Sequence, residues 1–277
     1  MKQDSNKPAA SVRKFSRKAR LAALAAAIVL GAGAIFYFST RITTQASMKE
    51  GRTYLKERAE HPVDEVIAKL NERDAQEAEA KEQELINGVR SGSISIWPLF
   101  KDSVIIGDSR ARGFGDYGDL PDSQVLAVIG SNITDIPDLQ GQIEAIKPKV
   151  IYVSYGMNDV ENKIGSDQGE DGFGKLYEEN LKKLLEKSPN SKIVVNAIIP
   201  PSAAVRASDP LWEAVDDYNR QIKEMCERNG WTYIDNTDLA EGGNAPIYEP
   251  DGIHFIASFY PTWGQSLLSS QYGNIAN

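Results

Sequence analysis

The sequence from about Ile94 to the C-terminus predicts an α/β fold with a parallel sheet that is covered by helices on both faces. Three observations lead to this prediction. Short runs of β-branched residues alternate with longer amphipathic stretches. The runs are apolar at nearly every position, which is typical of strands buried on both sides. About 180 residues are available, which suffice for one domain with a single core.

A basic segment and an apolar segment come before this domain. Residues 1–20 carry seven basic side chains and one acidic side chain, and residues 21–38, from Leu21 to Phe38, carry no charge. At about 1.5 Å per residue, a helix over 21–38 is roughly 27 Å long, close to the thickness of the hydrocarbon layer. Basic residues collect on the cytoplasmic side of membrane spans. We therefore expect a single-pass transmembrane helix, with residues 1–20 in the cytoplasm and the C-terminal domain outside.

A cleaved signal peptide is the alternative for this segment. The apolar run is long for a signal peptide, and the only small-residue cleavage site is the weak Thr44-Gln45-Ala46. We expect an uncleaved anchor in the cell membrane, while cleavage stays open at this point.

Residues 39–93 predict a charged helical stalk and a linker. Residues 64–89 are rich in Glu, Ala, Lys and Gln, which are strong helix formers. Their apolar stripe is broken, which favours a solvated helix with at most weak self-association. His61-Pro62 is typical of a turn before a helix, and Ser91-Gly92-Ser93 is typical of a linker.

The domain at 94–277 contains strand and helix patterns in alternation. The expected strands cover residues 103–106, 125–129, 150–154, 192–199 and 232–234. The expected helices cover residues 133–146, 173–186, 211–228 and 253–271. Residues 113–118 match G-x-G-x-x-G but open no clear helix, and we expect a loop there. Functional residues of open parallel sheets gather beyond the carboxyl ends of the strands, so the segments after the strands are the candidates.

Small and polar residues follow three of the strands. Gly107-Asp108-Ser109-Arg110 follows the first strand, Gly130-Ser131-Asn132 the second, and Gly156-Met157-Asn158-Asp159 the third. Asp251-Gly252-Ile253-His254 is predicted to begin the last helix. Together they supply a hydroxyl, an imidazole, a carboxylate and amide donors, the set that acyl transfer requires.

The four blocks, in this order, resemble the SGNH (GDSL-type) hydrolases over residues 103 to about 260. The resemblance implies a flavodoxin-like three-layer αβα sandwich. It implies that Ser109 is the nucleophile, His254 its base and Asp251 the carboxylate that orients His254. It also implies an oxyanion hole made of the Ser109 and Gly130 backbone N–H groups and the Asn158 side chain.

The whole layout resembles membrane-anchored members of that family from Gram-positive bacteria. The resemblance implies a cell-surface serine esterase that hydrolyses acyl esters, with O-acetyl groups on cell-wall or other glycans as the leading substrate. An O-acetyltransferase with the same Ser-His-Asp set and a non-catalytic surface binding module are the alternatives. Arg110 stands where the family name implies Leu, a departure outside the catalytic set.

Each candidate residue also has a structural explanation. Ser109 or Asp251 can cap a helix, and Asn158 can stabilise a turn. Asp108 and Asp159 are interpreted as structural residues that hold the loops.

Composition excludes several other classes of function. The net charge of −8 argues against nucleic acid as a partner. One cysteine, Cys226, excludes an internal disulfide, and the two histidines, His61 and His254, exclude a histidine-rich metal site. We expect no cofactor and no metal.

Overall fold

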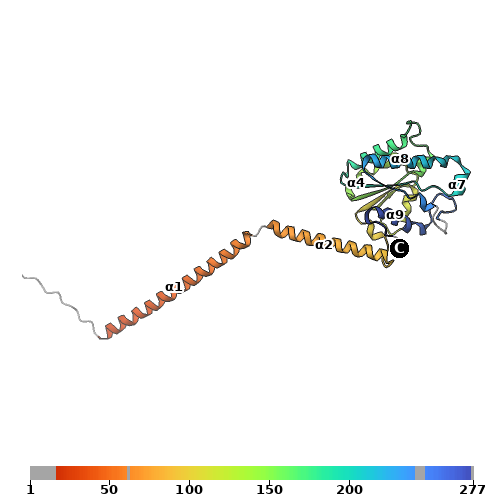
Figure 1. Ribbon diagram of the computed structural model, residues 1–277. Coiled ribbons are helices and arrows are strands. Elements are labelled where there is room, and N and C mark those ends of the chain that lie inside the picture. The colour runs from red at the N-terminus through yellow and green to blue at the C-terminus, as the bar shows by residue number, and fades with distance from the viewer. Residues whose placement is uncertain (1–16, 61–62, 241–246, 276–277) are drawn as a thin grey trace, which may run out of the picture. The chain divides into compact units, whose positions relative to one another are not determined.

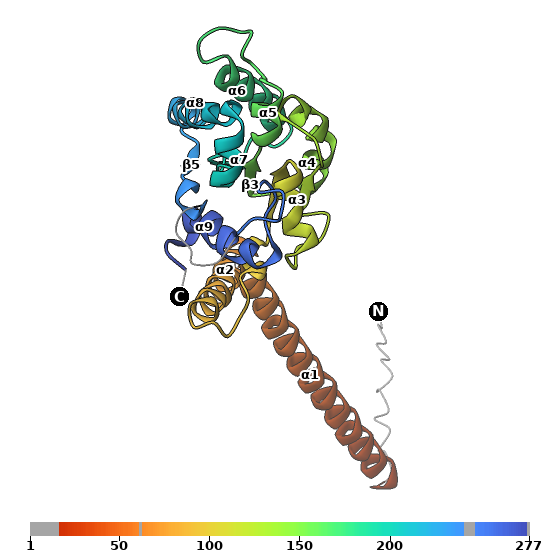
Figure 2. The ribbon, with the colours of Figure 1, turned by 90° about the vertical axis from the view of Figure 1, so that its right-hand side faces the viewer.

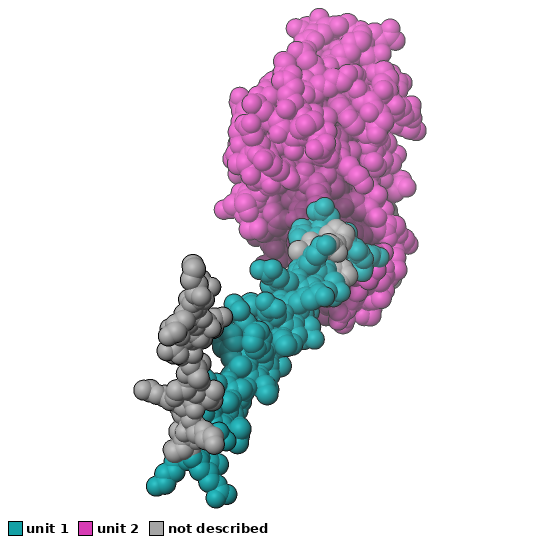
Figure 3. Space-filling model, turned by 90° about the vertical axis from the view of Figure 1, so that its left-hand side faces the viewer, with its two compact units in different colours: residues 1–75 teal, residues 76–277 magenta. Residues whose placement is uncertain are grey.

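The computed structural model describes residues 17–60, 63–240 and 247–275. The chain divides into two compact units, residues 1–75 and residues 76–277 (Figure 3). The second unit begins before residue 94, where the sequence predicts the domain to start. Ile86 and Val89, near the end of helix α2 (Val63–Arg90), are buried in its core. The last turns of α2 therefore belong to the globular unit.

Helix α1 (Arg17–Glu60) carries the apolar segment of the first unit (Figure 1). Among the described residues it is the one helix long and apolar enough to cross a membrane, over Arg20–Glu57. Its most apolar window has a mean hydropathy of 2.3, and none of that window is buried within the protein. The helix continues without a break past residue 38, where the predicted span ends. The turn predicted at His61-Pro62 lies outside the described residues.

The second unit is built on a five-stranded parallel sheet, as predicted. Its strands are β1 (Ser103–Gly107), β2 (Val125–Ala127), β3 (Val150–Ser154), β4 (Lys192–Asn196) and β5 (Thr232–Ile234). Their order across the sheet is β2-β1-β3-β4-β5. Gly107, at the end of β1, is level with Ala127 of β2 and Ser154 of β3. The loops after these three strands therefore leave the sheet side by side.

Helices cover both faces of the sheet. Successive residues of a strand point to opposite sides, and because the strands are apolar at nearly every position, both faces must be buried. Val104 and Ile106 of β1 pack in one core with α4 (Gln140–Ile146), α6 (Gly172–Leu185) and α8 (Ala214–Asn229). Ile105 packs in the other core with α3 (Ser109–Asp116), α9 (Tyr260–Tyr272) and the end of α2. Figures 1 and 2 show α8 and α9 on opposite sides of the sheet. The unit is a three-layer αβα sandwich, as predicted.

The remaining helical segments are short. They are α5 (Met157–Glu161), α7 (Ala203–Ser208) and the 3-10 turns η1 (Trp97–Phe100), η2 (Ile133–Leu139), η3 (Pro210–Glu213), η4 (Thr237–Ala240) and η5 (Ala257–Phe259). The loop predicted at residues 113–118 is wrong, because α3 extends to Asp116. Two predicted strands are also too long. β2 ends before Val128 and Ile129, which are exposed, and β4 loses its partner because β5 ends at Ile234.

Gly107 leaves no room for a side chain at the end of β1. A Cβ there would lie 2.2 Å from the Ser154 carbonyl oxygen and 2.5 Å from the Ala111 Cβ. We predict that Gly107→Ala lowers the free energy of unfolding by about 1–3 kcal/mol or more, because backbone must move to relieve the clash. Urea unfolding of the purified protein measures this loss.

Gly115→Ala in the neighbouring helix is the matched control. A Cβ there would have its nearest neighbour at 3.6 Å, an ordinary contact. Alanine in a helix is favoured over glycine by roughly 0.5–1 kcal/mol, so this variant should be as stable as the wild type or more so. Equal losses in both variants would contradict the close approach of β1 and β3.

Candidate active site

The candidate residues meet at the carboxyl edge of the sheet. Ser109 is the first residue of α3, separated from β1 by Asp108 alone, and Asn158 lies in α5, close after β3. Gly130 lies in the turn after β2, and Asp251 and His254 lie in the irregular segment before η5. Residues 145 positions apart in the sequence are therefore in contact. The sheet topology brings all five predicted residues to the same edge.

Ser109, His254 and Asp251 form a continuous chain of two hydrogen bonds. Ser109 Oγ lies 3.0 Å from His254 Nε2. His254 Nδ1 lies 2.6 Å from Asp251 Oδ2. Because an ionised carboxylate only accepts hydrogen bonds, Nδ1–H donates to Asp251, and in neutral His254 Nε2 accepts from the Ser109 hydroxyl. In this tautomer, the imidazole is placed to take a proton from Ser109.

Asp251 is fixed by its own backbone as well as by His254. Its Oδ1 accepts hydrogen bonds from the N–H groups of Ile253 and His254, at 2.8 and 2.9 Å. Partial burial raises the pKa of Asp251, but the bonds from His254 Nδ1 and from the two backbone N–H groups outweigh it and hold the pKa below its ordinary value. The carboxylate is therefore charged at neutral pH and can stabilise a protonated imidazole.

The prediction that Asp251 to His254 begin the last helix is wrong. That helix, α9, begins at Tyr260, and residues 251–254 form a turn around Asp251. Gly252 has a φ of 69°, in the left-handed region that glycine tolerates without strain. The turn, rather than a helix start, sets the position of His254.

Asp108 caps the helix that Ser109 begins. Its Oδ1 accepts a hydrogen bond from the Arg110 N–H at 2.9 Å. The hydroxyl of Ser109 is therefore not needed for capping, which removes the structural explanation for this residue. As the first helical residue, Ser109 has a backbone N–H with no acceptor within the helix, at the end where the helix dipole favours negative charge. Ser109 is partly exposed.

Gly130 and Asn158 lie in two loops that are tied together. Asn158 Nδ2 donates to the Ser131 carbonyl oxygen at 2.7 Å, and Ser131 Oγ donates to the Gly107 carbonyl oxygen at 3.1 Å. The first bond uses one of the two amide hydrogens of Asn158, and the second hydrogen can serve another acceptor. Gly130 is exposed and has a φ of 81°. Asn158 thus joins its own loop to the loop after β2, rather than stabilising a turn within its own loop, and its second amide hydrogen allows a further role.

Asp159, the residue after Asn158, also joins the segment after β3 to the segment after β2. It is fully buried, and its Oδ1 accepts a hydrogen bond from the Ile133 N–H at 3.0 Å. Its Oδ2 has no hydrogen-bond partner among the described residues. Burial raises the pKa of Asp159 to about 7; the Ile133 bond opposes this, and the charges of Asp108 and Asp135 add to it.

Arg110 is the residue of this site whose importance the sequence analysis missed. It is a buried arginine, 4% exposed, and its Nε donates to the Ile253 carbonyl oxygen at 2.9 Å. A charged side chain directly after Ser109, within an otherwise apolar helix face, is the signal that could have indicated it.

The part of the chain that the structure describes contains neither a cluster of metal-binding side chains nor an accessible thiol. No cluster of three or more His, Cys, Asp or Glu residues occurs there in a metal-binding arrangement. Cys226 is buried in α8, and burial raises the pKa of its thiol to about 12. His61 lies outside the described residues.

Comparison with known proteins identifies a family. Residues 102–260 match the sequence model of the GDSL-like lipase/acylhydrolase family. No curated protein matches the chain. An acetyl xylan esterase of known structure is similar with 19% identity and a TM-score of 0.48, over 61% of this chain and 99% of that one.

Two further solved structures are similar to the chain. A GDSL-like lipase from Bacteroides thetaiotaomicron has 15% identity and a TM-score of 0.46, over 61% of this chain and 86% of that one. The acetylxylan esterase Axe2 from Geobacillus stearothermophilus has 16% identity and a TM-score of 0.44, over 60% of this chain and 91% of that one.

The raised pKa of Asp159 predicts a dependence of stability on pH. Between about pH 4 and 7 the folded protein keeps a proton on Asp159 that the unfolded chain releases, so the stabilisation present at low pH is lost progressively over this interval and is gone above pH 7. We predict that the wild type loses about 2–3 kcal/mol relative to Asp159→Asn between pH 5 and pH 8. Urea unfolding of both proteins at the two pH values measures this difference.

Asp138→Asn, a change at an exposed acid of η2, is the control for this comparison. The control should follow the wild type at both pH values. If Asp159→Asn also followed the wild type, Asp159 would be charged in the folded protein across this range.

Proposed function

Because the chain belongs to the GDSL-like lipase/acylhydrolase family, we propose that it is a serine esterase with Ser109 as its nucleophile. One observation carries this proposal: the unbroken chain of hydrogen bonds from Ser109 through His254 to Asp251. A hydroxyl, a base and a carboxylate that orients the base are the arrangement that activates a serine for attack on a carbonyl.

In the first half of the reaction, Ser109 Oγ attacks the carbonyl carbon of the ester and His254 Nε2 takes the hydroxyl proton. The carbonyl π electrons move to the oxygen and form a tetrahedral oxyanion. Collapse of this intermediate breaks the bond to the leaving alcohol, which takes the proton from His254. The acyl group remains on Ser109, and Asp251 stabilises the imidazolium while it exists.

Donors for the oxyanion come from all three loops at this edge. The Ser109 N–H lies at the start of α3, the Gly130 N–H lies after β2, and the second amide hydrogen of Asn158 lies after β3. Loss of one such donor in other enzymes slows the reaction about 10²–10³-fold. We propose these three groups as the oxyanion hole.

In the second half, water attacks the acyl-enzyme while His254 takes its proton, and the acid leaves as Ser109 recovers its hydrogen. The exposure of the site favours water over a second alcohol as acceptor. The side chains of His254 and Asp251 are both 47% exposed. An enzyme that transfers its acyl group to an alcohol must keep water from a reactive intermediate, and an open site does not.

The substrate we propose is an O-acyl ester, with O-acetyl as the acyl group, on a cell-wall or other glycan. A partly exposed nucleophile beside an exposed base can reach an ester on a bulky polymer. The apolar helix α1 supports a place at the cell membrane, with the globular unit outside.

Substitution of the nucleophile and of its base tests the proposed reaction. We predict that Ser109→Ala and His254→Ala each lower kcat for p-nitrophenyl acetate by about 10³-fold or more, since the residues act as one unit. Acetate release is measured with and without a sugar acceptor, and circular dichroism monitors the fold. His61→Ala, which removes the other histidine, should leave kcat unchanged. Wild-type turnover by a folded His254→Ala protein would overturn the assignment, and acetyl transfer to the sugar in place of release would make the protein a transferase.

Protease treatment of intact protoplasts tests the proposed location. With a basic cytoplasmic segment before an uncleaved span, protease should remove the globular unit and leave a short membrane-bound fragment that carries an N-terminal tag. A cytoplasmic marker protein should stay intact in the same sample. Recovery of a shortened soluble protein from the medium would instead indicate a cleaved signal peptide.

A further inference from the structure

Arg110, the residue directly after Ser109, is a charged side chain placed inside the protein. It is 4% exposed, and a buried charge costs several kcal/mol unless hydrogen bonds and opposite charge compensate for it. Burial lowers the pKa of its guanidinium to about 10, with the charge of Asp108 acting in the opposite direction. Arg110 therefore remains charged at neutral pH.

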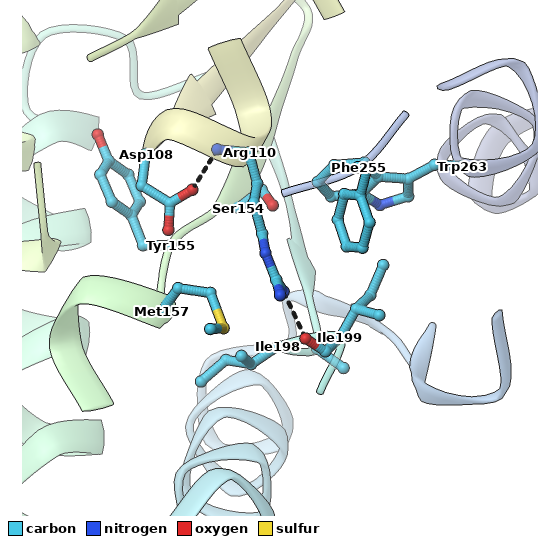
Figure 4. Close-up of a pocket in the computed structure, with 10 residues that line it drawn as sticks. Asp108, Arg110, Ser154, Tyr155, Met157, Ile198, Ile199, Phe255 and Trp263 are labelled. Atoms are coloured by element: carbon cyan, nitrogen blue, oxygen red, sulfur yellow. Dashed lines mark hydrogen bonds between the residues drawn. The ribbon is translucent and has the colours of Figure 1, made fainter. Parts of the chain in front are cut away.

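The guanidinium of Arg110 joins two loops that come from distant parts of the chain. Its Nε donates to the Ile253 carbonyl oxygen at 2.9 Å, and its Nη1 donates to the Ile199 carbonyl oxygen. Its carbon Cζ lies 4.5 Å from the centre of the Phe255 ring, a distance at which a cation attracts the face of an aromatic ring. Figure 4 shows the side chain running from the start of α3 to Ile199, with Phe255 beside it.

One nitrogen of Arg110 has no protein partner among the described residues. Nη2 is buried, and Arg110 lines a small cavity with Ser154, Ala197 and Met157. The cavity has room for about one water molecule, which could accept the remaining hydrogen bond. The side chain is thus held by its two carbonyl bonds and by Phe255.

The bond from Arg110 to Ile253 acts on the segment that carries the base. Ile253 is bonded to His254, and the same short turn contains Asp251. Asp251 Oδ1 holds the N–H groups of Ile253 and His254, whereas Arg110 holds the carbonyl oxygen of Ile253. A second bond links the backbone of Arg110 to the C-terminal part of the chain: the hydroxyl of Tyr260, at the start of α9, donates to the Arg110 carbonyl oxygen at 3.0 Å.

We propose that Arg110 is a positioning residue that sets the distance between Ser109 Oγ and His254 Nε2. This inference rests on the proposed esterase function. Ser109 and Arg110 are adjacent on α3, and the base follows the carbonyl that Arg110 holds, so one side chain fixes both partners of the 3.0 Å contact. Backbone bonds from the Ser202 N–H to the Gly252 carbonyl oxygen and from the Glu249 N–H to the His254 carbonyl oxygen, both at 2.8 Å, also hold this turn. Without Arg110, the carbonyl oxygen of Ile253, directly before the base, would lose its bond, and the base would have a wider range of positions.

Substitution of Arg110 by methionine removes the donors and keeps an unbranched apolar side chain beside Phe255. In the full chain, we expect Arg110→Met to lower kcat for p-nitrophenyl acetate by roughly 10–100-fold with little change in KM, because a displaced base slows the chemical step and not binding. Arg110→Lys keeps the charge but cannot donate to two carbonyls in a fixed fork, and it should lose roughly ten-fold. Arg112→Met removes the other arginine of the same helix, which pairs with Asp116 and Asp122 and not with the turn around Asp251, and should leave kcat unchanged.

A double substitution separates positioning from a merely structural role. If Arg110 acts through His254, then Arg110→Met in a His254→Ala background should cause no further loss of the residual activity. A further loss of roughly ten-fold or more in that background would overturn the proposal. So would wild-type kcat in a folded Arg110→Met protein.

Two controls keep the outcomes distinct. If Ser109→Ala retained activity, the esterase assignment itself would fail, whatever Arg110 does. Thermal unfolding of each variant identifies loss of the fold, and if Arg110→Met did not fold, Arg110→Lys with a normal kcat would overturn the proposal on its own.

Discussion

The parallel pairing of β1 with β3 is the constraint on which the rest of the site depends. The two strands are in register to their last residues, so that Gly107 lies beside Ser154 and the Asp108 N–H donates to the Ser154 carbonyl oxygen at 3.3 Å. Because Gly107 has no side chain, the start of α3 can lie close to the end of β3. Ser109 and Asn158 therefore begin from fixed, adjacent points, although 49 positions separate them in the sequence.

The edge of the sheet that carries the site holds many buried polar groups. Asp108 and Arg110 lie at the end of β1, and Asp159 lies in α5, after β3. A further group joins the ends of β4 and β5 to α9: Asn236 donates to Asn196 Oδ1 and accepts from Ser266 Oγ. Buried polar groups contribute little net stability, but when satisfied they specify one arrangement of the loops. At this edge they hold loops, which have no regular secondary structure to fix them.

Features that leave a local or periodic pattern in the sequence are predictable, whereas contacts between distant segments are not. Alternation of β-branched runs with amphipathic stretches predicts the parallel sheet and its layers, which the structure confirms. The blocks around Ser109, Gly130, Asn158 and His254 predict which residues share an edge, and the structure brings them together; their roles stay predictions. The bond from Arg110 to Ile253 leaves no periodic trace, because it pairs a side chain with a backbone carbonyl 143 positions away. The ends of β2 and β4 were misjudged for a related reason: apolar runs continue where the neighbouring strand has ended.

Burial of Cys226 has a consequence for the redox chemistry of the protein. It is the only cysteine in the sequence, and none of its surface is exposed. In oxidising surroundings an accessible lone thiol couples two molecules through a disulfide, or is oxidised to a sulfenic acid. Both reactions need a thiolate that reagents can reach, and the folded protein offers neither charge nor access. As long as α8 stays packed, the molecule is chemically inert toward oxidants at this position, and covalent dimers can form only through copies that have opened.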